Sequence, residues 1–427
     1  MVRRITVEES LPHDAGRALL VGRAWVPGSA GGPTPVTVRD GALIDISALA
    51  PTMADLLALP DCAARVASAD GPSLGALQDW LDDTCAYGPD PARRHLLAPN
   101  DLQVVKAAGV TFAASMLERV IEERTRGDAT GAAAVRASLV GILGDELSAV
   151  RPGSPEAARI KQVLLAQGLW SQYLEVGLGP DAEIFTKAAP LASVGTGVGV
   201  GIHPQSTWNN PEPEVVLAVS PEGAIVGAAL GNDVNLRDFE GRSALLLGKA
   251  KDNNASCSVG PWIRLCDEHF GIGDIATTDI ALTVTGEDGF VMRGHSSMRQ
   301  ISRAPQELVT HAMGVHHQYP DGMMLFCGTL FAPIDDRDEP GAGFTHHHGD
   351  RVAISAPRLG GLVNWVQDCT TLPPWTFGIV ALMRNLAGRG LLVPPDEGAD
   401  HLTGSARTRP ASTASTPSSP ASGMPRG

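Results

Sequence analysis

Residues 211–217 read Pro-Glu-Pro-Glu-Val-Val-Leu, a short segment in which two carboxylates lead into an apolar run. The apolar run predicts a buried β-strand. Because residues two apart in a strand point to the same face, the side chains of Glu212 and Glu214 converge. Two carboxylates this close repel each other, and a cation between them removes the repulsion. All-oxygen ligation selects a hard ion, so we expect Mg²⁺, with Mn²⁺ and Ca²⁺ as alternatives.

A third carboxylate follows two strands further along, where Gly231-Asn232-Asp233 ends a strand pattern. Asp233 would complete a set of three metal ligands. The alternative is a solvated acidic edge strand, since Glu-x-Glu is also common in exposed strands. The spacing by itself leaves both interpretations open.

The composition of the chain limits the classes of protein to which it can belong. Its 427 residues suit one large domain with an appended one, and 48 Gly and 32 Pro favour a β-rich fold with many tight turns. A formal net charge of -14 argues against binding to nucleic acids or to anionic membrane surfaces. The six cysteines show no Cys-x-x-Cys spacing, and no signal peptide or membrane span is evident, so we expect a soluble cytoplasmic protein.

Three regions follow one another along the chain. Residues 1–100, with β-like runs at 18–26 and 37–46 and a helical stretch at 53–67, predict a small N-terminal accessory domain. Residues 101–394 predict the main domain. Residues 395–427 are rich in Ser, Thr, Pro and Ala and predict a disordered tail.

The predicted main domain begins with helical patterns and continues with strands. Apolar spacing predicts helices at 103–124, 129–150 and 155–176. Short Val/Ile/Leu runs then predict strands at 214–220, 223–230, 275–285 and 351–355, with one more helix at 305–316.

Further motifs surround the carboxylates in a definite order: Gly231-Asn232-Asp233-Val234-Asn235-Leu236-Arg237-Asp238, Leu247-Gly248-Lys249, Gly260-Pro261-Trp262, Gly328-Thr329 and Gly349-Asp350. Over roughly residues 107–363 the chain resembles the fumarylacetoacetate hydrolase family. The resemblance implies an α+β fold, a mixed β-roll with a small N-terminal α/β domain and a helical insertion, assembled as a dimer or a dimer of dimers. It also implies that Glu212, Glu214 and Asp233 hold Mg²⁺.

Two residues depart from the hydrolytic pattern of that family. Ser115 stands where hydrolytic members carry a water-activating His, and a serine with no base partner cannot accept a proton at neutral pH as an imidazole does. Glu183 precedes Phe185-Thr186-Lys187, where the family usually has apolar residues. Both features resemble the dehydratase branch, which acts on 2-keto-3-deoxy sugar acids derived from D-xylonate or D-arabinonate.

This resemblance predicts dehydration of a 2-keto-3-deoxy-pentonate, a small 2-oxo sugar acid of pentose oxidation, through an enol to 2,5-dioxopentanoate. Metal chelation of the substrate acidifies its C3 protons. Glu183 is the predicted acid, and Lys249 or Lys251 the base, with a pKa lowered by burial and by the cation. The residues predicted to orient the substrate are Ser115, Arg237 and Thr329.

Several alternatives stay open at this stage. The chain could hydrolyse an acylpyruvate or fumarylpyruvate, decarboxylate a 2-oxo acid, or hold a metal without catalysis. Glu183 could be an ordinary exposed strand residue, and Arg237 a surface ion-pair partner of Asp238 or Glu240. The glycine-rich run 195–201 has the wrong spacing for a dinucleotide loop and predicts a loop near the active site. The run 346–348, three histidines, predicts a solvated loop.

Overall fold

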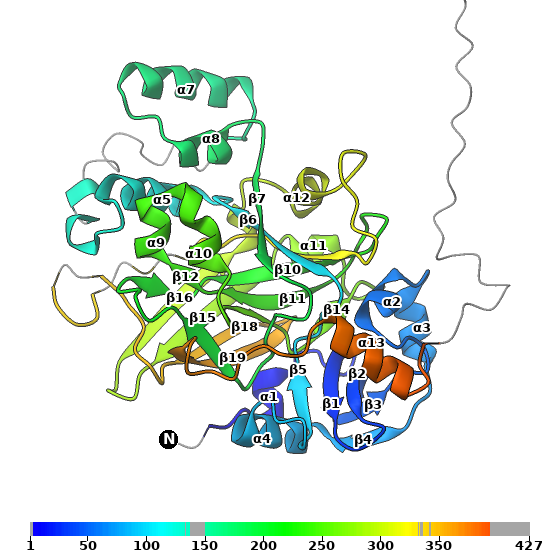
Figure 1. Ribbon diagram of the computed structural model, residues 1–427. Coiled ribbons are helices and arrows are strands. Elements are labelled where there is room, and N and C mark those ends of the chain that lie inside the picture. Colours follow the sequence, from blue (N-terminus) through cyan, green and yellow to red (C-terminus); the bar gives the residue numbers. More distant parts are fainter. Residues whose placement is uncertain are drawn as a thin grey trace, which may run out of the picture. The chain divides into compact units, whose positions relative to one another are not determined.

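The computed structural model describes residues 3–132, 134–136, 150–331, 333, 336–340 and 343–392 (Figure 1). The described residues up to Leu391 cluster as one compact unit. The predicted tail at 395–427 and most of the predicted helix at 129–150 lie outside the described residues. Within the described residues, no helix has the length and apolar character that a membrane crossing requires.

Twelve strands of the described residues form the main sheet, in the order β4-β3-β2-β1-β14-β11-β10-β17-β6-β7, with β13 paired to β11 and β5 to β1. Their bounds are β1 Leu20–Val26, β2 Gly32–Arg39, β3 Ala42–Asp45, β4 Ser73–Ala76, β5 His95–Leu97, β6 Val104–Gly109, β7 Glu183–Ala188, β10 Pro213–Val219, β11 Ile225–Asp233, β13 Cys257–Val259, β14 Ile263–Leu265 and β17 Met323–Phe326. Apart from Glu214, strand β10 is apolar, because both of its faces are buried: Val215 and Leu217 belong to one core cluster, and Val216 to another.

A second sheet has the order β16-β15-β18-β19-β8, and a short antiparallel pair joins β9 to β12. Their bounds are β8 Gly199–Ile202, β9 Asn209–Asn210, β12 Asn235–Leu236, β15 Asp279–Thr285, β16 Val291–Ser297, β18 Arg351–Ala356 and β19 Gly360–Asp368. Leu282 of β15 and Ile354 of β18 share the core cluster of Leu217. The two sheets therefore bury one apolar core between them.

The helices are mostly short: α1 Val7–Ser10, α2 Met53–Ala58, α3 Cys62–Ser68, α4 Leu77–Tyr87, α5 Ala113–Thr125, α7 Pro155–Ala166, α8 Gln172–Leu178, α9 Arg237–Arg242, α10 Leu247–Lys251, α11 Ile272–Ile275, α12 Pro305–Ala312 and α13 Ile379–Gly388. The 3₁₀ turns are η1 Ala129–Gly131, η3 Ala244–Leu246 and η4 Met298–Gln300. Helices α5, α9 and α10 lie side by side in Figure 1, where α9 contacts both others. They form the wall against which the carboxylates described below are placed.

The predicted fold class, α+β with mixed sheets, is confirmed. One helix prediction is wrong in part: residues 104–109 of the range 103–124 form β6, because they pair with β17 on one side and with β7 on the other. Tertiary pairing here overrides the local apolar spacing. The predicted helix at 53–67 is two helices, separated at Pro60.

The N-terminal strands continue the main sheet, because Leu20 of β1 pairs with Arg264 of β14. The domain boundary near residue 100 stays a prediction.

Candidate metal centre and active site

Three buried carboxylates meet where β10 and β11 run side by side. Glu214 pairs with Gly231, and the backbone N–H of Asp233 donates to the carbonyl of Glu212 at 3.1 Å. One carboxylate oxygen from each of Glu212, Glu214 and Asp233 lies within 4.8 Å of the others. The third ligand thus comes from the neighbouring strand, and not from two strands further along. The three side chains are at most 6% exposed, so the alternative of a solvated acidic edge is wrong.

The electrostatics of this cluster fit a divalent cation. Burial raises the pKa of Glu214 well above its usual range, and the charges of Asp233 and Glu212 raise it further. The backbone N–H of Gly328 donates to Oε2 of Glu214 at 2.6 Å, which partly offsets the repulsion. A set of three carboxylates without sulfur or nitrogen suits a hard ion such as Mg²⁺, Mn²⁺ or Ca²⁺.

Two lysines and one arginine contact the same carboxylates. Lys187 Nζ lies 2.7 Å from Oδ1 of Asp233. Lys251 Nζ donates to Oε2 of Glu212 at 2.5 Å and to Oδ2 of Asp233 at 3.1 Å. Arg119 Nη2 donates to Oε1 of Glu212 at 2.6 Å. The centre therefore holds its carboxylates in place through direct charge-assisted hydrogen bonds.

The structure separates the two lysines between which the sequence could not choose. Lys251 is 2% exposed and contacts two of the three carboxylates. Lys249 is exposed, and its Nζ lies over the ring of Phe239. Burial lowers the pKa of Lys251, but the carboxylates of Asp233 and Glu212 outweigh burial and raise it above its ordinary value. This direction is opposite to the lowered pKa that we predicted.

Glu183 lies at the start of β7, opposite Gly109 of β6, as expected for a residue that faces the site. Its carboxyl group lies against the α-carbon of Gly109. Burial raises the pKa of Glu183, while the charges of Arg119 and Lys251 lower it. The side chain is partly buried and within electrostatic reach of the centre, so the alternative of an ordinary exposed strand residue is wrong.

A cavity beside Glu212 brings together the three residues predicted to orient a substrate. Ser115, Arg237 and Thr329 all line it. Ser115 Oγ donates to the carbonyl of Phe112 at 2.9 Å, and Thr329 Oγ1 accepts from the N–H of Phe331 at 3.1 Å. The other lining residues are Glu118, Arg119, Glu122, Asn210, Asn235 and Phe331.

Residues 214–367, which contain Glu214, Asp233 and Lys251, match the C-terminal fumarylacetoacetate hydrolase family. Over these residues the chain is similar to that family. The resemblance inferred from the ordered motifs is confirmed.

Two relatives and one solved structure are similar to the chain. A protein from Haloferax volcanii described as a probable 2-keto-3-deoxyxylonate dehydratase is 27% identical over 329 residues, which cover 77% of this chain and 93% of that protein. The 2-dehydro-3-deoxy-D-arabinonate dehydratase of Saccharolobus solfataricus is 31% identical over 188 residues, 43% of this chain and 58% of that protein. A structure of 2-keto-3-deoxy-D-arabinonate dehydratase complexed with magnesium and 2,5-dioxopentanoate shares the fold, with a TM-score of 0.56, 20% identity, and coverage of 82% of this chain and 99% of that one.

Arg119, which contacts Glu212, is a residue of the site that sequence reasoning missed. Its Nη1 lies 2.7 Å from Oε2 of Glu122 and 2.9 Å from Oε2 of Glu240, while Nη2 holds Glu212. The spacing of 115, 118, 119 and 122 along α5 is a signal that could have found it, because residues three, four and seven apart share one face of a helix.

Arg237 is buried, so the alternative of a surface ion pair with Asp238 or Glu240 is wrong. Its side chain is 2% exposed and lies 2.8 Å from Glu118 and 2.6 Å from Glu122. Its guanidinium also stacks 4.1 Å above the ring of Trp208. With these partners, Arg237 shapes the cavity wall and fixes α5 to α9.

The prediction of a solvated histidine loop is also wrong for its first residue. His346 is buried, and its Nδ1 lies 3.1 Å from Oδ2 of Asp350. Arg337 donates to the same carboxylate at 2.5 Å. Burial of this pair anchors the loop to the start of β18.

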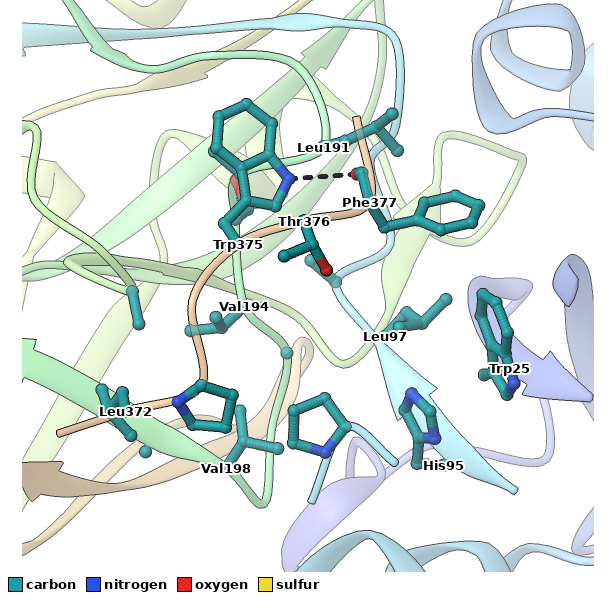
Figure 2. Close-up of a pocket in the computed structure, with 18 of the residues that line it drawn as sticks. Trp25, His95, Leu97, Leu191, Val194, Val198, Leu372, Trp375, Thr376 and Phe377 are labelled. Atoms are coloured by element: carbon teal, nitrogen blue, oxygen red, sulfur yellow. Dashed lines mark hydrogen bonds between the residues drawn. The ribbon is translucent and has the colours of Figure 1, made fainter. Parts of the chain in front are cut away.

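A second cavity, of about 460 Å³, has a lining set that includes none of the three carboxylates. Figure 2 shows Trp25, His95, Trp375 and Phe377 around it. Gly195 and Val198 of the glycine-rich run line this cavity and not the one beside Glu212.

Proposed function

We propose that this protein is a Mg²⁺-dependent dehydratase that converts a 2-keto-3-deoxy-pentonate, derived from D-xylonate or D-arabinonate, into 2,5-dioxopentanoate and water. The observation that carries this proposal is the buried triad of Glu212, Glu214 and Asp233, with Lys251 in contact with it and Glu183 nearby. The two relatives, both described as dehydratases, support the same class of reaction.

Each residue of the site has its own role in this elimination. Glu212, Glu214 and Asp233 would hold Mg²⁺, which would supply the Lewis acidity that acidifies the C3 protons of the substrate. In our proposal Lys251 takes a C3 proton, and Glu183 donates a proton to the C4 hydroxyl, which leaves as water. A double bond forms between C3 and C4, and tautomerisation then gives the C5 aldehyde.

The charge states that this mechanism needs follow from the surroundings of the two residues. The raised pKa of Glu183 keeps its carboxyl protonated to higher pH than an exposed glutamate, as an acid requires. The carboxylates of Asp233 and Glu212 raise the pKa of Lys251 and so favour its protonated form. The neutral lysine that a base requires forms only when their negative charge is offset. The positive charge of Arg119 lowers the pKa of Lys251 and so favours the neutral lysine.

Hydrolysis is the less supported alternative. Ser115, which by the family resemblance stands in place of the hydrolytic His, lines the cavity, and its hydroxyl donates to the carbonyl of Phe112. The cavity lining given by the described residues contains no His. Activation of a water molecule by an imidazole is therefore not provided at this wall.

The decisive experiment compares substrates. The purified protein, stripped of metal and reloaded with Mg²⁺, is incubated with the 2-keto-3-deoxy acids derived from D-xylonate and from L-arabinonate, which differ at C4, and with an acylpyruvate. Formation of 2,5-dioxopentanoate, lost on metal removal, supports the proposal. Pyruvate released from the acylpyruvate would instead indicate a hydrolase, and metal binding without turnover a scaffold. Glu183→Gln should lower kcat by about 100-fold or more.

We also propose that the protein is cytoplasmic and that it assembles as a dimer or a dimer of dimers. Both are expected from the sequence. Sedimentation of the purified full chain tests the assembly.

A further inference from the structure

The pair of strands β9 and β12 places two asparagines directly opposite each other beside the carboxylates. Asn210 pairs with Asn235 in the strand register. Asn210 lies two positions before Glu212, and Asn235 lies two positions after Asp233. Asn210, Asn235 and Glu212 all line the same cavity. Two amides thus extend the carboxylate centre along the cavity wall.

The hydrogen bonding of these two side chains is incomplete. Asn210 is 2% exposed and Asn235 is 1% exposed. Asn210 Nδ2 donates to the carbonyl of Pro211 at 2.9 Å, which fixes the amide so that Oδ1 is left as an acceptor. Within the part of the chain that the structure describes, Oδ1 of Asn210 and both polar atoms of Asn235 have no partner.

Asn209, the other residue of β9, differs because its side-chain amide is hydrogen-bonded within the protein. Its Oδ1 accepts from the N–H of His346 at 3.1 Å, and its Nδ2 donates to Ser206 Oγ at 3.3 Å. The amide of Asn209 is fully used by the protein, and that of Asn235 is not. Buried polar groups are normally paired, so unpaired ones that line a cavity indicate a ligand.

The donor and acceptor pattern defines the chemistry of that ligand. The acceptor Oδ1 of Asn210 requires a hydrogen donor, which a carboxylate cannot supply. Asn235 offers both a donor and an acceptor. A hydroxyl group, which donates once and accepts twice, can satisfy Nδ2 of Asn235 and one of the two Oδ1 atoms. The hydroxyls of Ser115 and Thr329 on the same cavity wall suit the same kind of ligand.

We propose that Asn210 and Asn235 bind the terminal C5 hydroxyl of the substrate and so select hydroxylated 2-oxo acids over shorter or apolar ones. This inference rests on the proposed function. In that reaction the C4 hydroxyl leaves, so C5 carries the one substrate hydroxyl that stays. The amides therefore act on specificity, and not on the C3–H and C4–O bonds that break in the elimination.

A substrate that lacks only this hydroxyl tests the proposal. 4-Hydroxy-2-oxopentanoate keeps the C3 protons and the C4 hydroxyl, and its elimination gives 2-oxopent-3-enoate and water. Wild-type enzyme should prefer the pentonate. Asn235→Ala should lower kcat/KM for the pentonate by about 10- to 100-fold and leave kcat/KM for the analogue within about threefold. Asn210→Ala should act in the same direction.

Asn209→Ala is the matched control, because it removes a buried amide from the same strand that the protein itself uses. It should lower stability and affect both substrates equally. Mn²⁺ affinity, measured by calorimetry, should stay within about twofold of wild type in the Asn210 and Asn235 variants. If Asn235→Ala does not fold, Asn235→Ser and Asn210→Ala decide the question.

The outcomes separate this inference from the proposed function. Equal losses on both substrates, or an unchanged preference for the pentonate, would overturn the role of the two amides while leaving the dehydratase in place. Wild-type protein that binds Mn²⁺ but converts neither substrate would overturn the proposed function, and the inference with it.

Discussion

Arg119 and Glu212 are joined by a buried ion pair in which Nη2 lies 2.6 Å from Oε1. The other end of the same guanidinium holds Glu122 and Glu240. Glu212 is also held at its second oxygen by Lys251. One arginine on α5 thus connects a proposed metal ligand from the edge of β10 to two helices.

Arg119→Met should weaken the binding of Mg²⁺ and Mn²⁺ by about 10- to 100-fold, because groups that orient a metal ligand typically contribute that much. Titration calorimetry on folded protein measures the effect. Arg136→Met is the control, since Arg136 lies 2.7 Å from Glu118 and its ion pair involves none of the three carboxylates. Equal metal affinity in wild type and Arg119→Met would show that the ion pair serves only the fold.

Lys251→Met should lower kcat by about 1000-fold or more, whereas Lys249→Met should keep kcat within about threefold of wild type. Lys251 is buried against Glu212 and Asp233, while Lys249 is exposed. Steady-state kinetics with the pentonate and saturating Mg²⁺ compare the two. A larger loss in Lys249→Met would assign the base to the exposed lysine.

The family resemblance predicted the triad, but not its surroundings. Alternation in a strand brings Glu212 and Glu214 together, the ordered motifs include Asp233, and departures from the hydrolytic pattern indicated Ser115 and Glu183. The choice between Lys249 and Lys251 needed α10, because residues two apart in a helix point about 200° apart, to opposite sides. No strand or loop pattern carries that information.

Tertiary contacts account for what the sequence did not predict. Arg119 meets Glu212 and Glu240 only because α5 packs beside α9, across more than 90 positions of chain. The pairing of Asn210 with Asn235 depends on a two-residue strand that is too short to show a periodicity. Residues 104–109 have helical spacing but lie inside a sheet.

Glu240→Gln should change how stability depends on pH. Burial raises the pKa of Glu240 to about 7 from an ordinary 4.5; the charges of Arg119 and Lys251 oppose this rise, and those of Glu122 and Glu212 add to it. A raised carboxyl pKa means that the folded state binds the proton more tightly, so stability is full below about pH 4.5 and falls as pH rises through about 7. Between about pH 5 and pH 8, metal-free wild type should lose at least about 1.4 kcal/mol relative to Glu240→Gln in urea unfolding. Parallel pH profiles of the two proteins would contradict the raised pKa.

Gly109→Ala should displace the carboxyl group of Glu183 from the site while the residue itself is kept. A Cβ at position 109 would overlap the Glu183 carboxyl, and this flexible side chain would have to move away from the site. We expect kcat to fall by about 10-fold or more with a small change in Tm. Gly273→Ala is the control, because a Cβ at Gly273 meets no atom within 4 Å. In the double variant Gly109→Ala/Glu183→Gln, kcat should equal that of Glu183→Gln alone, since both changes remove the same carboxyl from the reaction. Additive losses would mean that Gly109 acts on the site by another route.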